Sequence, residues 1–176
     1  MKKEEREKII ADLNKSTDEL MENFSSFPEK YFTIKPSETG WSAAEIGEHL
    51  VMFEKFVVIF LNGETKSKER SSAERISTVH QAFQDLEKKY VAPATVIPSG
   101  KLTDKNEIIS RLKSAREKII EAIATHDLNL ICATYRHFAF GELSKLEWIY
   151  FTIHHSERHL HQLKNLFSKL QTNSAS

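Results

Sequence analysis

Long stretches of this 176-residue chain lack both glycine and proline, and within them apolar residues recur every three or four positions. The five glycines and four prolines fall mostly in short clusters. The longest cluster, VAPATVIPSG at 91–100, must be irregular because its prolines forbid helix. Such punctuation is typical of a bundle of long helices. With 40% apolar residues the chain can bury one core, so we expect an all-α fold in a single domain.

Apolar stripes predict four helices, at about 3–24, 43–62, 105–127 and 145–170. Two of them begin with a capping box, in which a serine stands three residues before a glutamate: Ser42 with Glu45, and Ser144 with Glu147. Asp104 is the expected cap of a third. Residues 76–90 are compatible with one further short helix.

The connection from about 63 to 103 is long enough to return the chain across the full length of a bundle. The second and third long helices can therefore run parallel, joined by this crossover. No internal repeat or linker indicates a second domain. We expect the bundle to occupy residues 1–170 and the serine-rich tail, 171–176, to be disordered.

Composition excludes several classes of partner. The chain has 25 basic and 25 acidic residues, so its net charge offers no attraction for nucleic acid or an acidic membrane. Its N-terminus lacks the apolar core of a signal peptide, and no stretch has the length of a membrane span. A single cysteine, Cys132, is typical of a reducing compartment and has no context that would make it reactive. We expect a cytoplasmic protein that acts on a small molecule.

Four histidines crowd into HHSERHLH at 154–161. His155 and His159 are four residues apart, so they project from one face of a helix as a chelating pair, and apolar neighbours indicate that this face points inward. The segment reads HSERH, so it lacks the glutamate that the HExxH metalloproteases need in that position. His49 lies on the apolar stripe of the second helix and could complete a three-histidine metal site.

Each of these histidines is also compatible with a hydrogen-bonded core role. His154, Arg158 and His161 share a neighbouring face, for which a solvated rim is the simpler interpretation. Arg158 is nevertheless a candidate contact for an anionic substrate. The remaining histidines, at positions 80, 126 and 137, stand alone in the sequence, and we expect them at the surface or in capping roles.

Two segments together resemble the DinB and YfiT superfamily. WSAAEIGEHLVMFE (41–54) resembles its second-helix signature, and HFAFGELSKLEWIYFTIHHSERHLHQ (137–162) resembles its loop and fourth-helix signature, with Phe138 where the family has proline. APATVIPSGKLTDKNEIISRL (92–112) is similar to the connection between them. The resemblance spans nearly the whole chain.

The resemblance implies a four-helix bundle with up-down-down-up topology. It also implies a divalent metal on His49, His155 and His159, with Gln162 as a supporting residue. Imidazole ligands suit zinc, nickel and iron, of which zinc is the first expectation. Reactions in the superfamily include S-transfer with a low-molecular-weight thiol cosubstrate and proposed hydrolysis, and a homodimer is compatible with the family.

Three functions follow as hypotheses. The first is a metal-dependent enzyme, a thiol S-transferase or a hydrolase. The second is a non-catalytic bundle that a metal stabilises, and the third, a DNA-damage-related binding protein, is disfavoured by the neutral charge. Glu54 and Glu157 lie off the ligand faces of their helices, so no carboxylate is well placed as a base, which favours thiol transfer over hydrolysis.

Overall fold

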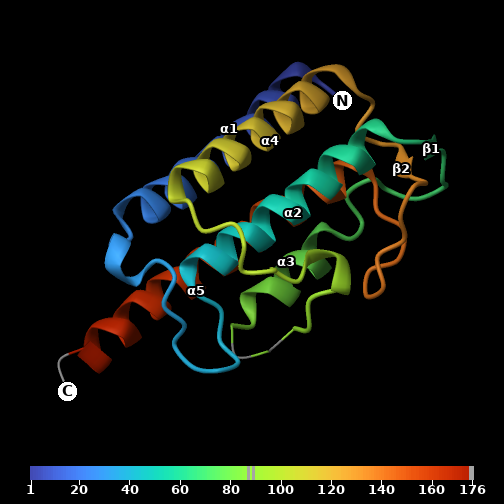
Figure 1. The fold of residues 1–176 in the computed structure, drawn as a ribbon. Helices are drawn as coiled ribbons and strands as arrows, with labels where there is room; N and C mark the ends of the chain where they lie inside the picture. The colour runs from blue at the N-terminus through green and yellow to red at the C-terminus, as the bar shows by residue number, and fades with distance from the viewer. Residues whose placement is uncertain (87, 89, 175–176) are drawn as a thin grey trace.

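Four long helices dominate the computed structural model, which describes residues 1–174 except 87 and 89 (Figure 1). The elements in chain order are α1 (Lys3–Ser26), η1 (Glu29–Tyr31), α2 (Ala43–Asn62), β1 (Thr65–Lys66), α3 (Ile76–Gln84), η2 (Ala94–Val96), α4 (Lys105–Thr125), β2 (Ile131–Cys132) and α5 (Lys145–Ser174). The all-α prediction is confirmed. None of the described helices is both long and apolar enough to cross a membrane.

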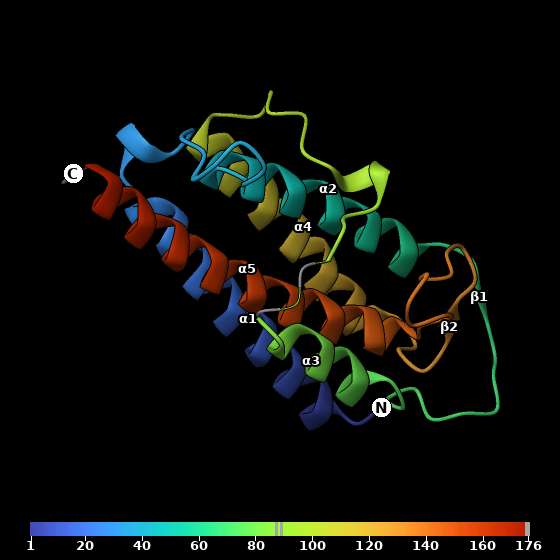
Figure 2. The ribbon, with the colours of Figure 1, turned by 90° about the horizontal axis from the view of Figure 1, so that it is seen from below.

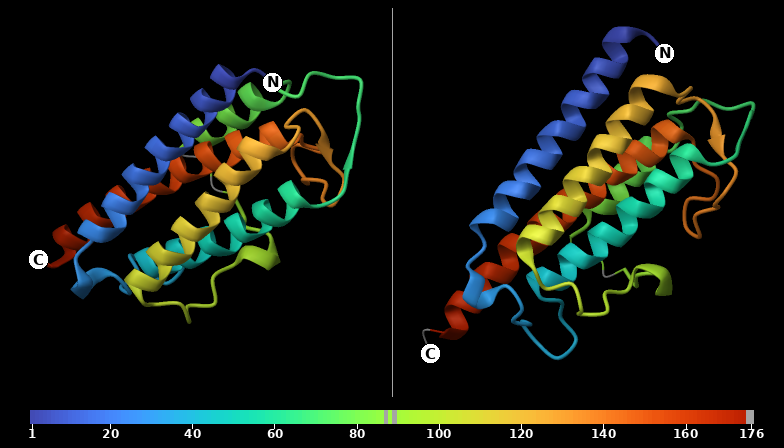
Figure 3. Two further views of the ribbon diagram at one scale, coloured as in Figure 1. Left: turned by 90° about the horizontal axis from the view of Figure 1, so that it is seen from above. Right: turned by 45° about the horizontal axis from the view of Figure 1, so that its top comes forward.

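The long helices pack in the cyclic order α1, α4, α2, α5. In Figures 1 and 3, α1 and α5 run in one direction and α2 and α4 in the other, so the expected parallel pair and its crossover are both present. The crossover contains α3, which lies along the outside of α5 (Figure 2). It also contains η2, which packs against α2.

Some boundaries differ from the predictions. The helix within 76–90 ends at Gln84, and α5 continues to Ser174, four residues past the predicted end. The predicted disorder of residues 175–176 lies outside the described residues. The antiparallel pair β1–β2 was not predicted because strands of two residues carry no alternating pattern.

Both capping boxes form. In the first, Ser42 Oγ accepts from the Glu45 amide at 3.2 Å, and the Ser42 amide donates to Glu45 Oε2 at 3.0 Å. In the second, the Ser144 amide donates to Glu147 Oε2 at 2.8 Å. Glu147 also binds both terminal nitrogens of Arg70 at 2.7 Å, which ties the crossover to the start of α5. These contacts fix where the two histidine-bearing helices begin.

The apolar core consists of two clusters, one toward each end of the bundle. Between them, each long helix contributes one polar side chain: Thr17, Glu54, Arg116 and Ser156. Arg116 donates to both carboxylate oxygens of Glu54 at 2.8 and 2.6 Å, to Ser156 Oγ at 2.5 Å and to Thr17 Oγ1 at 3.2 Å. Arg116 and Glu54 are 2% and 0% exposed, so their charges rely on each other instead of on water.

Removing one charge of this pair is expected to destabilise the bundle strongly. Glu54→Gln leaves the Arg116 guanidinium buried without a counter-charge, which costs about 3 kcal/mol of the free energy of unfolding. Urea denaturation measures the loss. The matched double variant, Glu54→Leu with Arg116→Met, removes both charges and is expected to recover most of it.

Glu107→Gln is the surface control, because it breaks the exposed Glu107–Arg111 pair and is expected to change stability by less than about 1 kcal/mol. Equal small effects of Glu54→Gln and Glu107→Gln would contradict the role given to the buried pair.

Candidate metal centre

The three predicted histidines meet at the contact between α2 and α5. His49 lies in the second turn of α2, and His155 and His159 lie one turn apart on α5. Their exposed fractions are 4%, 8% and 7%. His155 Nε2 lies 3.2 Å from His49 Nε2 and 3.0 Å from His159 Nε2. The structure therefore brings together, as one buried triad, the residues that sequence spacing and family resemblance had nominated.

The other ring nitrogens show how two of the imidazoles are oriented. His49 Nδ1 donates to the backbone carbonyl of Val96 at 2.7 Å, so its proton is on Nδ1 and its Nε2 carries a lone pair. His159 Nδ1 lies 2.9 Å from Gln162 Oε1 and is oriented in the same way. Gln162 thus takes the supporting position that the resemblance implied.

Hydrogen bonding within the triad cannot satisfy all three inward nitrogens. The Nε2 atoms of His49 and His159 both carry lone pairs, so only His155 Nε2 can donate a proton. That single proton can form a good hydrogen bond to only one of the two acceptors. His155 Nδ1 is itself buried, and none of the described residues forms a hydrogen bond with it. A cation at the centre would accept all three lone pairs at once, because zinc–nitrogen bonds of about 2.1 Å in tetrahedral geometry place the nitrogens about 3.4 Å apart. The separations of His155 Nε2 from His49 Nε2 and from His159 Nε2, 3.2 and 3.0 Å, are close to that value.

Burial keeps these imidazoles neutral, which is the form that binds metal. It lowers the pKa of His159 to about 3. It lowers the pKa of His155 well below the usual range, an effect that the neighbouring His159 and His49 increase. The pKa of His49 is also lowered by burial, against the opposing hydrogen bond to Val96.

Aromatic rings surround the triad. The Phe53, Phe83 and Phe151 rings lie 4.4, 5.4 and 5.8 Å from the His155 ring, and Trp41 lies 5.0 Å from His49. These side chains come from α2, α3, α5 and the segment before α2. They give the triad apolar walls, which strengthen electrostatic interactions inside the site.

Arg158, the candidate substrate contact, forms hydrogen bonds with the crossover. Its guanidinium donates to the carbonyls of Asp85, at 2.6 Å, and Lys88, and lies 5.0 Å from the centroid of the Tyr90 ring. Contact with a substrate remains a prediction for this residue. The two carboxylates judged to be poorly aimed are engaged elsewhere: Glu54 with Arg116, and Glu157 with His154 at 2.9 Å.

The other histidines have separate surroundings. His137 Nδ1 accepts from the amides of Ala139 and Phe140 within the turn that follows it, and burial lowers its pKa to about 4. His80 is not isolated, as its sequence position had indicated, because its ring lies 4.4 Å from that of His154. No local sequence pattern connects these two. Cys132 is buried, and burial raises the pKa of its thiol to about 12, which agrees with the expected lack of reactivity.

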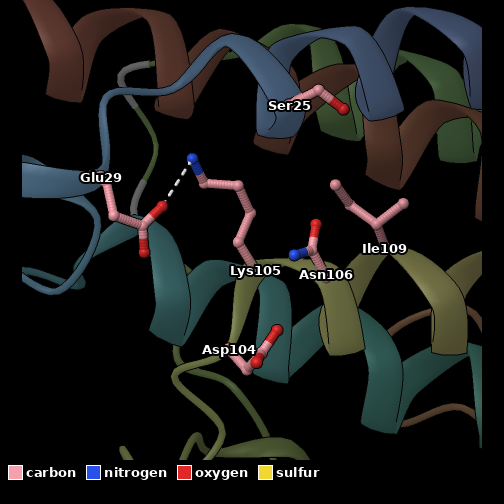
Figure 4. Close-up of a pocket in the computed structure, with 6 residues that line it drawn as sticks. All are labelled: Ser25, Glu29, Asp104, Lys105, Asn106 and Ile109. Atoms are coloured by element: carbon pink, nitrogen blue, oxygen red, sulfur yellow. Dashed lines mark ion pairs between the residues drawn. The ribbon is translucent and has the colours of Figure 1, made fainter.

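A hollow of about 330 Å³ lies where the end of α1 meets the start of α4 (Figure 4). Its lining residues are Ser25, Glu29, Asp104, Lys105, Asn106 and Ile109. Lys105 Nζ crosses this junction, pairing with Glu29 at 2.9 Å and donating to the Phe27 carbonyl at 2.6 Å. Because Lys105 and Glu29 are engaged in holding two helix ends together, this hollow is a weaker candidate for a functional site than the triad.

The fold and the triad define a four-helix bundle with a candidate metal centre between two of its helices. A model of the DinB superfamily matches residues 12–163, and the chain belongs to this superfamily. The uncharacterized protein YuaE of Bacillus subtilis strain 168 is 25% identical over 162 residues, covering 90% of this chain and 96% of YuaE. TT2238, a four-helix bundle protein of known crystal structure, shares 20% identity at a TM-score of 0.58, covering 91% of this chain and 98% of TT2238. The latter similarity confirms the fold alone.

Gln162 is expected to tune metal affinity without being a ligand. Gln162→Leu removes the acceptor that orients His159, and losses of this kind weaken metal binding about 10- to 100-fold. Competition with a chromophoric chelator measures the affinity for Zn²⁺. Asn165→Leu, at an exposed position one turn further along α5, is the control and is expected to leave affinity unchanged. Equal affinities of the two variants would contradict the orienting role.

Proposed function

We propose that this protein is a metal-dependent enzyme that acts on a small molecule, with His49, His155 and His159 as the ligands of one divalent transition metal. The observation that carries the proposal is the set of three inward Nε2 atoms, which hold at most one proton between them. Zinc is the first expectation, and nickel or iron suits the same ligands.

Three imidazoles leave at least one coordination position for substrate, as in catalytic zinc sites and unlike closed structural ones. A bound ion would supply Lewis acidity there, lowering the pKa of a thiol or of water. The protein's own contribution is orientation and exclusion of solvent. Val96 and Gln162 hold two of the ligands in one tautomer, and the aromatic walls keep bulk water from the site.

Between the two reaction classes, we propose thiol S-transfer ahead of hydrolysis. In S-transfer the thiolate sulfur forms the new bond to carbon, the leaving group departs with its bonding electrons, and the thiol proton passes to solvent. Hydrolysis additionally benefits from a general base. The two carboxylates considered as bases are already engaged, since Glu54 is hydrogen-bonded to Arg116 and Glu157 to His154.

Loss of a ligand is expected to abolish tight metal binding. After dialysis, the wild-type chain is expected to retain about one equivalent of metal by elemental analysis, and His49→Ala and His155→Ala to retain almost none. His161→Ala, an exposed position on α5, is the control and keeps the metal. Unchanged metal content in both ligand variants would refute the triad as the site.

Catalysis is tested by supplying the metal-loaded protein with electrophiles together with low-molecular-weight thiols, and separately with hydrolysable esters and amides. Turnover is expected with a thiol, and it is expected to disappear in His159→Ala. The alternative function is a non-catalytic bundle that the metal stabilises. A lack of any turnover, together with a melting temperature that falls by several degrees on chelation, would favour that alternative.

A further inference from the structure

A second pair of histidines lies outside the triad, on the contact between α3 and α5. The rings of His80, from α3, and His154, from α5, have centroids 4.4 Å apart. The planes of these two rings are inclined at 37°, compared with 89° between His155 and His159. We refer to His80 and His154 as the outer pair.

One member of the outer pair is oriented in the same way as the triad ligands. His154 Nδ1 lies 2.9 Å from Glu157 Oε2 and donates to it, so in the neutral imidazole the lone pair is on Nε2. A carboxylate that accepts from the far nitrogen of an imidazole is a common support of a metal-binding histidine. Glu157 also places a negative charge beside the pair.

The outer pair has room for an ion and for its water. It borders a hollow of about 230 Å³ whose wall also includes Phe83, Gln84, Leu86, Glu157, Arg158 and His161. The side chains of His154 and Glu157 are 14% and 52% exposed, so solvent can complete a coordination shell. The Arg158 guanidinium also lines this hollow but is bonded to the carbonyls of Asp85 and Lys88. Its charge weakens cation binding, and that of Glu157 offsets it.

We propose that His80 and His154 form a second, weaker site for a borderline divalent metal such as Zn²⁺, Ni²⁺ or Cu²⁺, with Glu157 as the residue that orients His154. Two imidazoles select these ions over Mg²⁺ and Ca²⁺, which prefer oxygen ligands. The site stands whether or not the triad is catalytic, because it shares no ligand with it.

Occupancy of the outer pair would fasten α3 to α5. Phe83 is three residues after His80 on α3, and its ring lies 5.4 Å from that of His155. A metal that holds α3 in place therefore also holds one wall of the triad. Metal binding at the outer pair would therefore affect the triad through the packing of the Phe83 ring on His155.

Calorimetric titration of the full chain with Zn²⁺, against a competing chelator, tests the proposal. Wild type is expected to bind one tight and one weaker equivalent. His80→Ala and His154→Ala are each expected to lose the weaker equivalent and keep the tight one. Glu157→Gln is expected to weaken it about 10-fold. His161→Ala, in the same hollow, is the control and retains both.

A single equivalent in wild type, or a weaker equivalent that survives in both His80→Ala and His154→Ala, would overturn the outer site. His159→Ala separates this result from the fate of the triad, since it is expected to lose the tight equivalent alone. Hydrogen exchange gives a second readout: α3 amides are expected to exchange more slowly when the weaker equivalent is bound. Exchange in α3 that metal leaves unchanged would count against the link between α3 and α5.

Discussion

The buried ion pair of Arg116 and Glu54 is the interaction on which the geometry of the bundle depends. The Arg116 guanidinium contacts one side chain from each of the other long helices. A shift of α2 along α4 would leave a charge unpaired in the core, and a shift of α1 or α5 would break a hydrogen bond to Thr17 or Ser156. Apolar packing alone tolerates such shifts better, because it has no directional requirement. The pair also lies at the level of the triad: Ser156 directly follows His155, and Glu54 is five residues after His49. The contacts of Arg116 with Glu54 and Ser156 therefore fix the relative axial positions of α2 and α5, and so bring the three imidazoles together.

Orientation of the imidazoles follows a second rule, in which the nitrogen that faces away from the site is fixed by an acceptor. The acceptor is a backbone carbonyl for His49, a side-chain amide for His159 and a carboxylate for His154. His155 is the exception, and it is also the ring most closely surrounded by aromatic side chains. Packing restricts its rotation where hydrogen bonding does not. All three kinds of acceptor favour the tautomer whose proton is on Nδ1.

Sequence patterns predicted what is local in this structure. Apolar stripes and capping boxes located the long helices, and helix geometry alone placed His155 beside His159. The approach of His49 depends on how α2 packs on α5, which no spacing encodes, and family resemblance supplied it. Val96 could not have been predicted as a partner, because a backbone carbonyl in a proline-rich segment has no sequence signature. His80 was missed for a related reason: its partner is 74 positions away, and only the docking of α3 on α5 brings them together. The parallel arrangement of α2 and α4, by contrast, followed correctly from the length of one connection, and the family resemblance implied the full up-down-down-up topology.

The crossover between α2 and α4 is itself part of the site. Residues adjacent to two of the triad histidines bind the crossover. Glu48, beside His49, accepts from Ser99 and Gly100, and Arg158, beside His159, donates to carbonyls just after α3. The crossover in turn supplies the Val96 carbonyl to His49 and the Phe83 ring to His155. The crossover and the two histidine-bearing helices thus stabilise each other, so His49 and His155 reach their observed orientations only when the crossover is docked. The crossover that permits α2 and α4 to run parallel therefore also completes the candidate metal centre. Its contact with His49 explains why the segment around η2 has a defined conformation although it lacks helical periodicity.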